Sequence, residues 1–346
     1  MYFATTMPSR TIIAVLSAAL LIAITKGTVL GESAAIIGVG DVGMTVSDMD
    51  RSVAFYTQVL DFKQISDDEI SGSAFERLEG IFGAHARVVR LQLGTETIAL
   101  TAYLTPGGRP IPIDSASNDR WFQHIAIVVS DMRRAYARLR AARAGYASTE
   151  PELRPKTIPD AAGIWAFYFR DPDNHIIEAL QFPPDKGDPK WHRLRSNAVF
   201  LGIDHSAIVV ADTQTSLRFY VAELGFTIAG TSDNFGTEQE HLNNVEGARL
   251  HITTLRAASG PGIELLEYQT PRTGRPYPSD ERANDVVHWQ TQLVVRDVGV
   301  TYAAAIRDRD TIVSKEPVDV MATPLRFFNG FLLRDPDGHV MEVISR

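Results

Sequence analysis

The sequence predicts an α+β fold built from four βαβββ modules in tandem. Each module is expected to begin with an alternating apolar strand that ends at an Asp, followed by a segment with helical spacing. These four strands are predicted at residues 42–48, 125–131, 206–212 and 291–297. Each Asp is placed to cap its helix, because its side chain can accept hydrogen bonds from the first helical turn. Two or three strand-like runs complete each module.

The two halves of the chain are copies of each other. The segment that begins Arg109-Pro-Ile-Pro recurs as Arg275-Pro-Tyr-Pro, and FYFRDPDNHIIE, which ends at Glu178, recurs as FLLRDPDGHVME, which ends at Glu342. The copies align almost without gaps, as expected for a tandem duplication. The sequence therefore predicts a first domain at 38–183, a linker at 184–200 that contains Pro, Gly and charged residues, and a second domain at 201–346.

Composition excludes several classes of function. The 346 residues include 34 Lys and Arg against 42 Asp and Glu, and neither end carries a basic run, so nucleic acid is not expected as a partner. The 45% of hydrophobic residues is enough for two buried cores. The chain has no Cys, so any metal ion must be held by nitrogen and oxygen ligands.

The N-terminal segment is typical of a secretory signal peptide. Fifteen uncharged residues, 11–25, lie between Arg10 and Lys26, fewer than the roughly 20 that a membrane-spanning helix needs. Residues 1–33 are therefore expected to be a signal peptide, and the protein to be exported to the periplasm or secreted. An uncleaved N-terminal membrane anchor is the alternative. No later segment is expected to span a membrane.

Several stretches resemble the vicinal oxygen chelate superfamily, which includes glyoxalase I, bleomycin-resistance proteins and extradiol dioxygenases. They are VSDMDRSVAFYTQVLDF, QHIAIVVSDM, DHSAIVVADTQTSLRFYVAELGF and RDPDGHVMEV, and the resemblance extends from about residue 38 to the end of the chain. It implies that two modules pair into one cup-shaped, half-open barrel with a divalent metal ion on its floor. The metal ligands would come from the first and last strands of each module, and each predicted domain would form one cup.

The resemblance also implies which positions hold the ligands. The first-strand position lies seven residues before each capping Asp, at Asp41, His124, His205 and Gln290. The last-strand position falls at Ala99, Glu178, Glu264 and Glu342. The second domain is therefore expected to hold a metal ion with His205, Glu264, Gln290 and Glu342. In the first domain, Asp41, His124 and Glu178 form a candidate second site.

Glyoxalase I is the superfamily member whose ligand types this set resembles. The resemblance implies an isomerase, epimerase or lyase that acts on a small substrate chelating the metal through adjacent oxygens, with Glu264 or Glu342 as the base that moves the proton. Zinc, nickel, manganese and iron(II) all accept imidazole and carboxylate ligands, so the identity of the metal stays open. The protein is expected to be a monomer or a homodimer.

Two other functions remain open. An extradiol-type dioxygenase resembles a two-His, one-carboxylate iron site, but Gln290 occupies the second His position unless His288 replaces it, and residues 327–334 lack the expected His and Tyr. A non-catalytic, bleomycin-resistance-like binding protein would have a cup without metal. His241 and Asn243, in a polar stretch before the predicted strand at 248–255, and His288 are candidates for the substrate lining.

Overall fold

The computed structural model describes residues 36–193 and 197–346, in addition to Met1. Residues 32–346 form one compact unit, and the description below concerns that unit alone. The predicted signal peptide lies outside the described residues except for Met1, so export stays a prediction. Among the described residues, no helix has both the length and the apolar character needed to cross a membrane.

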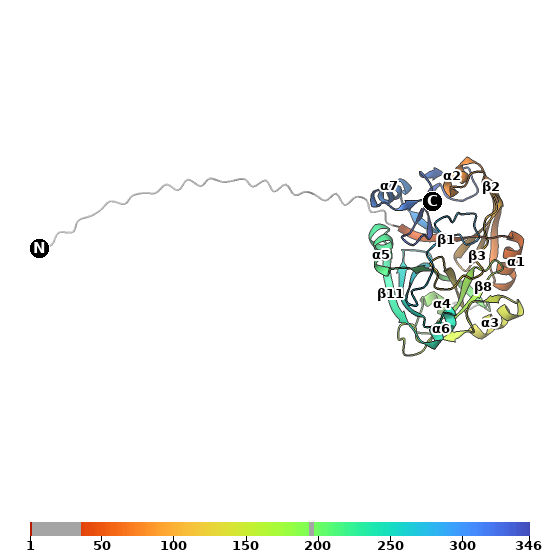
Figure 1. Ribbon diagram of the computed structural model, residues 1–346, viewed down its shortest axis with the longest axis vertical. Coiled ribbons are helices and arrows are strands. Elements are labelled where there is room, and N and C mark those ends of the chain that lie inside the picture. The colour runs from red at the N-terminus through yellow and green to blue at the C-terminus, as the bar shows by residue number, and fades with distance from the viewer. Residues whose placement is uncertain (2–35, 194–196) are drawn as a thin grey trace. The chain divides into compact units, whose positions relative to one another are not determined.

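Four modules follow one another along the chain, as the sequence predicts (Figure 1). The first contains β1 (Ile36–Thr45), α1 (Met49–Val59), β2 (Lys63–Ser71), α2 (Ser73–Glu79), β3 (His85–Leu93) and β4 (Glu96–Thr105). The second contains β5 (Gln123–Val129), α3 (Met132–Ala141), β6 (Gly145–Tyr146), β7 (Glu152–Leu153), β8 (Trp165–Arg170) and β9 (Ile176–Gln181). The short helix α4 (Pro189–Arg193) follows it.

The second half of the chain repeats this order. The third module contains β10 (Phe200–Val210), α5 (Thr213–Leu217), the π-helical segment η1 (Arg218–Glu223), β11 (Thr227–Asn234), α6 (Thr237–Asn243), β12 (Arg249–Arg256) and β13 (Gly262–Thr270). The fourth contains β14 (Trp289–Val295), α7 (Val298–Asp308), β15 (Thr311–Ile312), β16 (Val318–Asp319), β17 (Asn329–Arg334) and β18 (Val340–Ser345). The predicted α+β class is confirmed.

The helix that follows the first strand of each module begins at a capping Asp. The four caps are Asp48, Asp131, Asp212 and Asp297. Each side chain accepts a hydrogen bond from the backbone N–H three residues further on, at 2.7 to 3.0 Å. These bonds satisfy N–H groups that would otherwise lack a partner in the first turn. The predicted caps are confirmed, and they set the register of the strand before each helix.

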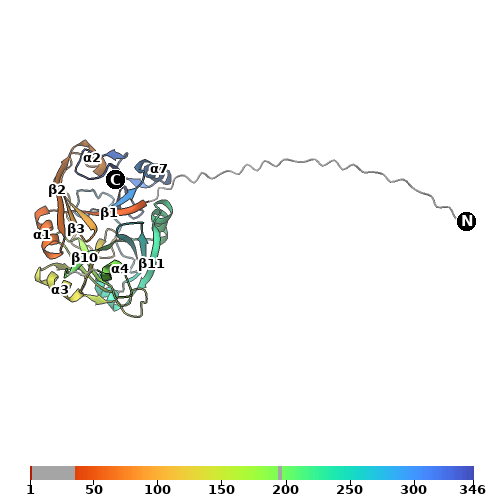
Figure 2. The same ribbon diagram turned by 180° about the vertical axis from the view of Figure 1, so that it is seen from behind.

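Strand pairing does not follow the two halves of the chain. One sheet has the order β15-β17-β18-β14-β1-β4-β3-β2 and joins the first module to the fourth; we call it the outer-module sheet. The other has the order β11-β12-β13-β10-β5-β9-β8-β6 and joins the second module to the third; we call it the inner-module sheet. Figure 1 and Figure 2 both show the red and orange first module beside the blue fourth module. The prediction that each half of the chain forms one cup is therefore wrong.

The two halves are nevertheless united by their buried cores. One hydrophobic cluster joins α1 and β1 of the first module to α3 and β5 of the second, and another joins the third and fourth modules in the same way. Two further clusters lie within the sheets, one between the first and fourth modules and one between the second and third. The two modules of each half therefore share a core, whereas each sheet joins a module of the first half to a module of the second half.

The duplicated Arg-Pro segments hold this arrangement together. Arg109 follows the first module and binds Asp285, which precedes the fourth, with 2.6 Å between Nη2 and Oδ2. Arg275 follows the third module and binds Asp119, which precedes the second, with 2.7 Å between the same atoms. Each backbone N–H also donates to the same carboxylate. The two copies thus form a reciprocal clamp between the modules.

Glycines let the two connecting segments approach each other closely. A Cβ atom on Gly108 would lie 1.7 Å from the backbone oxygen of Asn284, and one on Gly274 would lie 1.7 Å from that of Asn118. No other residue fits at such distances, so each copy of Gly-Arg-Pro is shaped by contact with the other copy.

Candidate metal centre

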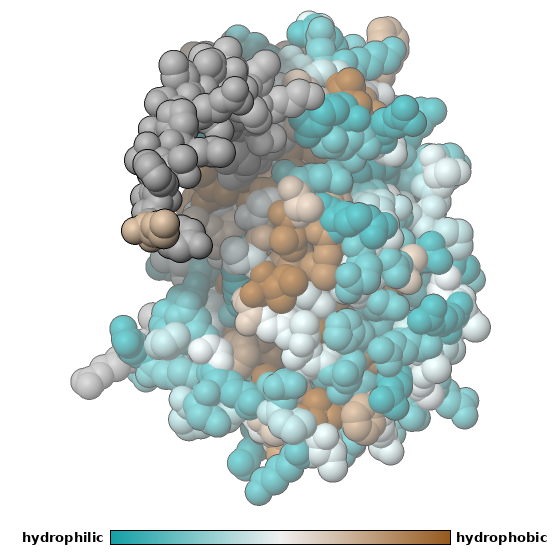
Figure 3. All heavy atoms as spheres, turned by 90° about the vertical axis from the view of Figure 1, so that its left-hand side faces the viewer, coloured by the Kyte–Doolittle hydropathy of each residue, from teal (hydrophilic) through white to brown (hydrophobic). Residues whose placement is uncertain are grey.

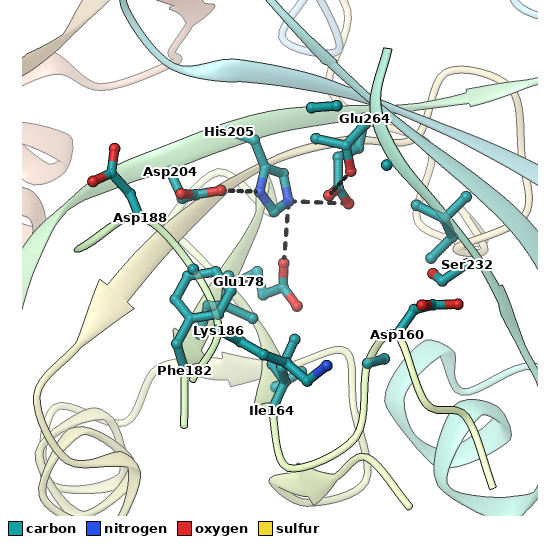
Figure 4. Close-up of a pocket in the computed structure, with 18 of the residues that line it drawn as sticks. Asp160, Ile164, Glu178, Phe182, Lys186, Asp188, Asp204, His205, Ser232 and Glu264 are labelled. Atoms are coloured by element: carbon teal, nitrogen blue, oxygen red, sulfur yellow. Dashed lines mark hydrogen bonds and ion pairs between the residues drawn. The ribbon is translucent and has the colours of Figure 1, made fainter. Parts of the chain in front are cut away.

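Four side chains converge on the concave side of the inner-module sheet. Nε2 of His124 lies 3.2 Å from Oε2 of Glu178, and Nε2 of His205 lies 3.6 Å from the same oxygen. The ligand atoms of these three residues all lie within 4.8 Å of one another. Oε2 of Glu264 lies 3.4 Å from Nε2 of His205. Figure 4 shows Glu178 and Glu264 both directed towards the His205 imidazole.

The strand register explains this convergence. The two central strands, β5 and β10, run antiparallel, so that His124 lies opposite Ala207 and His205 lies opposite Ala126. Strand β9 runs parallel to β5 and places Glu178 beside Ala126. Strand β13 runs parallel to β10 and places Glu264 beside Ala207. Because residues on the same face of a sheet are neighbours, the two small Ala side chains leave space between the four larger ones.

The two imidazoles are buried, and three of their four ring nitrogens lack a hydrogen-bond partner among the described residues. His124 is 1% exposed and His205 is 4% exposed. Both ring nitrogens of His124, and Nε2 of His205, are buried without a hydrogen bond to any described residue. Unsatisfied buried polar atoms cost roughly 1–3 kcal/mol each. His124, Glu178 and His205 bring two imidazoles and a carboxylate together, with Glu264 beside His205, and a divalent cation accepts such donors, so the residues present fit a metal ion.

Asp204 orients one of the imidazoles. Its Oδ2 accepts a hydrogen bond from Nδ1 of His205 at 3.0 Å, and the same carboxylate accepts from Arg256 at 2.8 Å and from Trp191 at 3.0 Å. A proton on Nδ1 leaves the lone pair of Nε2 free to face the two Glu side chains. Carboxylate support of this kind is the usual second contact of a metal-binding His.

The metal-free site favours a protonated His205. Burial alone would lower the pKa of the imidazole, but the carboxylates of Glu264, Asp204 and Glu178 raise that pKa to about 9. For Asp204, burial acts to raise the pKa of the carboxyl group, yet the hydrogen bond from His205 holds it well below its usual range. A metal ion and this proton compete for Nε2, so binding of the metal releases the proton.

Residues on the neighbouring strands complete the floor. Oγ1 of Thr254 donates to Oε1 of Glu264 at 2.8 Å. Tyr168 lies opposite Glu178 in the β8–β9 ladder, and its ring centre is 4.9 Å from that of His124. Burial raises the pKa of Tyr168 well above its usual value. The sequence analysis missed these two residues, although each stands ten positions before its Glu.

A cavity of about 960 Å³ opens above the floor. Glu178, His205 and Glu264 line it, as do apolar side chains from both modules, namely Ile164, Leu180, Phe182, Leu242, Ile252 and Leu266. The predicted linker forms part of its wall, because residues 186–190 also line the cavity; Figure 4 labels Lys186 and Asp188 there. Sites for small molecules are typically about 300–1,000 Å³, so the cavity matches such a site in volume.

The four-residue site predicted for the second domain is divided by the fold. His205 and Glu264 lie in the inner-module sheet, whereas Gln290 on β14 and Glu342 on β18 lie in the outer-module sheet. Their expected places are taken by His124 and Glu178, which the sequence analysis assigned to a separate site with Asp41. Each candidate ligand thus has the position along its strand that the resemblance implied. The module that supplies the other half of the site is different.

The equivalent floor of the outer-module sheet is filled by its own side chains. Asp41 lies 3.0 Å from Nε of the buried Arg90. Nε2 of Gln292, at the position equivalent to Ala126, donates to Oε2 of Glu342 at 2.9 Å. Burial, together with the charge of Glu79, raises the pKa of Glu342 to about 7. In this sheet, the described residues contain no His, Asp and Glu group with metal-ligand spacing.

The three predicted lining residues lie elsewhere. His241 is exposed on α6, with Nδ1 3.1 Å from Glu152, and this pair forms a second group with ligand spacing at the surface together with Glu150. Asn243 is buried on the same helix. His288 is buried before β14, with Nδ1 2.6 Å from Oε1 of Glu281. None of the three lines the cavity above the metal centre.

The fold is that of four βαβββ modules in two sheets, and comparison with known proteins shows the family to which it belongs. The chain belongs to the Glyoxalase/Bleomycin resistance protein/Dioxygenase superfamily, whose sequence model matches residues 38–179 and 202–343. The predicted resemblance is therefore confirmed. No curated protein sequence matches the chain.

Solved structures with a similar fold include glyoxalase I from Zea mays, with a TM-score of 0.54 and 16% identity over 90% of this chain and 92% of that one. A mutant of that enzyme has a TM-score of 0.58 at 16% identity, again with 90% and 92% covered. A putative dioxygenase from Bacillus subtilis has a TM-score of 0.56 at 13% identity, with 90% and 86% covered. At these identities the similarity shows the fold alone.

Proposed function

We propose that the protein is a glyoxalase-like, metal-dependent enzyme that moves a proton next to a carbonyl group. Its substrate would be a small molecule with adjacent oxygens that chelate the metal, and the reaction an isomerisation, an epimerisation or a lyase step. One observation carries this proposal. Two buried imidazoles with unsatisfied nitrogens and two carboxylates meet on the floor of a cavity of about 960 Å³.

His124, Glu178, His205 and Glu264 would hold the metal ion. When bound there, it supplies Lewis acidity that stabilises negative charge on the substrate oxygens. The imidazole and carboxylate ligands suit zinc, nickel, manganese and iron(II) alike. Asp204 keeps Nε2 of His205 directed at the site through its hydrogen bond to Nδ1.

Glu264 is the better placed of the two carboxylates to carry a proton. Glu178 is contacted by both imidazoles, at 3.2 and 3.6 Å, whereas Glu264 is contacted by His205 alone. The side chain of Glu264 is 20% exposed and that of Glu178 is 8% exposed. Thr254 fixes Oε1 of Glu264, and Oε2 faces His205 at the candidate centre. Glu264 would therefore take the proton next to the carbonyl and return it to a neighbouring atom.

A ring-cleaving dioxygenase is the second candidate, and the structure strengthens it. His124, Glu178 and His205 form a compact two-His, one-carboxylate group, the type that holds iron(II) in many oxygenases. The missing second His, which counted against this function in the sequence, is supplied by His124 from another module. Tyr168 lies beside this group. The fourth carboxylate, Glu264, favours the glyoxalase-like reaction.

Metal analysis tests the site. We expect about one divalent metal ion per chain by inductively coupled plasma mass spectrometry, and its loss in His124→Ala. Gln290→Ala is the matched control, because Gln290 occupies the same register in the outer-module sheet. Loss of metal in the control alone would restore the site predicted for the second domain. Absence of metal after reconstitution would favour a non-catalytic binding protein.

Activity tests the reaction. The metal-loaded protein is expected to exchange the hydrogen next to the carbonyl of α-hydroxyketones or hemithioacetals with deuterium from solvent, followed by nuclear magnetic resonance. Glu264→Gln should lose this exchange while Glu342→Gln keeps it. Oxygen consumption with catechols by the iron(II) form, without hydrogen exchange, would instead establish the dioxygenase.

We also propose export of the protein, supported by the uncharged stretch 11–25 between Arg10 and Lys26. Cell fractionation of the full chain, with the N-terminal sequence of the recovered protein, tests this. A cleaved protein in the periplasm or medium is expected. An intact N-terminus in the membrane fraction would show an anchor instead.

A further inference from the structure

Four cationic side chains line the cavity above the metal centre, and only two of them have a carboxylate partner. Nζ of Lys190 lies 2.8 Å from Glu96, and Nη2 of Arg256 lies 2.8 Å from Asp204. The other two cations are Arg154 and Lys186. Their described hydrogen bonds go to uncharged acceptors only. Among the described residues, Arg154 and Lys186 therefore have no carboxylate at ion-pair distance.

Arg154 is the buried member of this pair, at 3% exposure. Its Nη1 donates to Oε1 of Gln239 at 2.7 Å, and its Nη2 donates to the backbone oxygen of Glu238 at 2.7 Å. Its Nε is buried without a hydrogen-bond partner. A buried guanidinium normally pairs with a carboxylate or phosphate, because removal from water is costly for an unpaired charge.

The guanidinium lies within electrostatic range of the metal centre. Burial lowers the pKa of Arg154, while the nearby Tyr168 and Glu178 act in the opposite direction. Arg154 and Glu178 line the same cavity, and apolar side chains such as Ile164 and Leu180 line it as well. A single molecule can therefore contact the metal centre with one end and Arg154 with the other.

We propose that Arg154 binds a carboxylate of the substrate, separate from the adjacent oxygens that face the metal centre. The substrate class is then an organic acid in which an apolar spacer joins a chelating group to a carboxylate. The half-buried Lys186, whose Nζ bonds only the backbone oxygen of Pro159, adds positive charge to the same cavity. A singly charged group suits the site better than a phosphate, because Asp160, Asp188 and Glu264 also line the cavity. The chelating end of this substrate rests on the proposed function.

A purely structural role would leave two features of Arg154 unexplained. The bonds to Gln239 and Glu238 attach the segment after β7 to α6, and a neutral donor would provide that attachment equally well. Neither bond uses Nε, and neither neutralises the charge. Gln239→Ala removes the partner of Nη1 and keeps the cation, so it separates attachment from charge recognition.

Three probes of equal length test the proposal by isothermal titration calorimetry. Octanedioic acid monohydroxamate carries a chelating group and a carboxylate, octanohydroxamate carries the chelating group alone, and octanoate carries the carboxylate alone. With the metal-loaded wild type, the first probe is expected to bind about ten- to a hundredfold more tightly than the second, as for a charge-assisted hydrogen bond. Homologous probes with shorter spacers allow for the unknown distance between the two ends.

The variants assign this advantage to Arg154. Arg154→Met should abolish the preference for the carboxylate probe and leave the affinity for octanohydroxamate unchanged, whereas Gln239→Ala should retain the preference. Equal binding of the two hydroxamates by the wild type at every spacer length would overturn the proposal, and so would a preference that persists in Arg154→Met. The wild-type comparison stands even when a variant does not fold.

Failure of the proposed function gives a different result. If octanohydroxamate does not bind the metal-loaded protein, the chelating site is absent. Titration of the metal-free protein with octanoate then decides about Arg154 alone. Binding that Arg154→Met weakens about tenfold supports the carboxylate site, and binding that is equal in both proteins refutes it.

Discussion

The inner-module and outer-module sheets share one architecture, yet the same four positions hold different residues in each. The inner-module sheet has, at these positions, His205, His124, Glu178 and Glu264. The outer-module sheet has, in the same order, Asp41, Gln290, Glu342 and Ala99. Between them, Ala126 corresponds to Gln292. The inner floor has unsatisfied imidazole nitrogens, whereas the outer floor is closed by hydrogen bonds among its own side chains.

The charges of the two floors show why one suits a metal and the other does not. At the position where the inner-module sheet has Thr254, the outer-module sheet has Arg90, whose guanidinium binds Asp41 at 3.0 Å. In the outer floor, this guanidinium supplies the positive charge that a metal ion would supply in the inner floor. The duplicated chain therefore contains two sheets of similar architecture. A few substitutions on the floor distinguish the sheet with the candidate metal centre from the sheet with the packed floor.

Filling the inner floor with a larger side chain should have the largest effect on metal binding. Ala126→Gln copies the outer floor and places an amide beside Glu178, so we expect loss of the metal ion and of activity. Extra side-chain volume in a packed site also costs roughly 1–3 kcal/mol of stability. Metal content and thermal denaturation check both effects. Gln292→Ala, the reverse change in the outer floor, is the control and should keep the metal; full metal content in Ala126→Gln would contradict the comparison.

Neutralising Glu342 should stabilise the protein at high pH. Burial and the charge of Glu79 raise the pKa of Glu342 from 4.5 to about 7, so the folded state favours the protonated acid. Below pH 4.5 the acid is protonated in both states, and Glu342→Gln should change little. Between pH 4.5 and 7 the unfolded wild type releases this proton while the folded protein retains it, so the advantage of the variant should grow over this range and level off at about 3 kcal/mol above pH 7.

Urea denaturation of both proteins from pH 4 to 8 measures this difference. Glu316→Gln, at an exposed position, serves as the control. A gain that does not grow with pH would show that Glu342 carries no buried charge at neutral pH.

Removing the support of His205 should weaken metal binding without abolishing it. In Asp204→Asn the carboxylate that accepts from Nδ1 of His205 is lost, and second contacts of this type are worth roughly ten- to a hundredfold in metal affinity. Competition with a chelator gives the dissociation constant. Asp188→Asn, which changes an exposed residue of the cavity wall, should leave it unaltered. Equal affinities in all three proteins would remove Asp204 from the site.

Breaking either half of the reciprocal clamp should have the smallest effect on the free energy of unfolding, and the two effects should be equal. Arg109→Ala and Arg275→Ala each remove a half-exposed Arg from a buried Asp, at 2.6 and 2.7 Å, and we expect a loss of about 1 kcal/mol for each. Urea denaturation measures both values. A large loss in one variant and none in the other would show that the two connections do not support the fold equally.

Much of the fold was predictable because its signals are local. The four capping Asp residues and the apolar alternation before them placed the end of each first strand within three residues, although β1 and β10 begin six residues earlier than predicted, and the repeats placed the last strands. Those two signals gave the register to which the family resemblance was applied, so His124, Glu178, His205 and Glu264 were all identified as candidates. Tyr168, Thr254 and Arg154 were not, because cross-strand neighbours and loop contacts leave little trace in a single sequence.

The sequence alone determined the modules, their order and the position of each candidate ligand along its strand, since helix caps and strand periodicity act over a few residues. Only the tertiary structure decided which modules share a sheet. Four similar modules offer similar first strands, so β5 could pair with β1 as well as with β10 on local grounds. The choice depends on contacts between distant segments, such as Arg109 with Asp285 and Arg275 with Asp119. That choice brought the two His residues together in one cup.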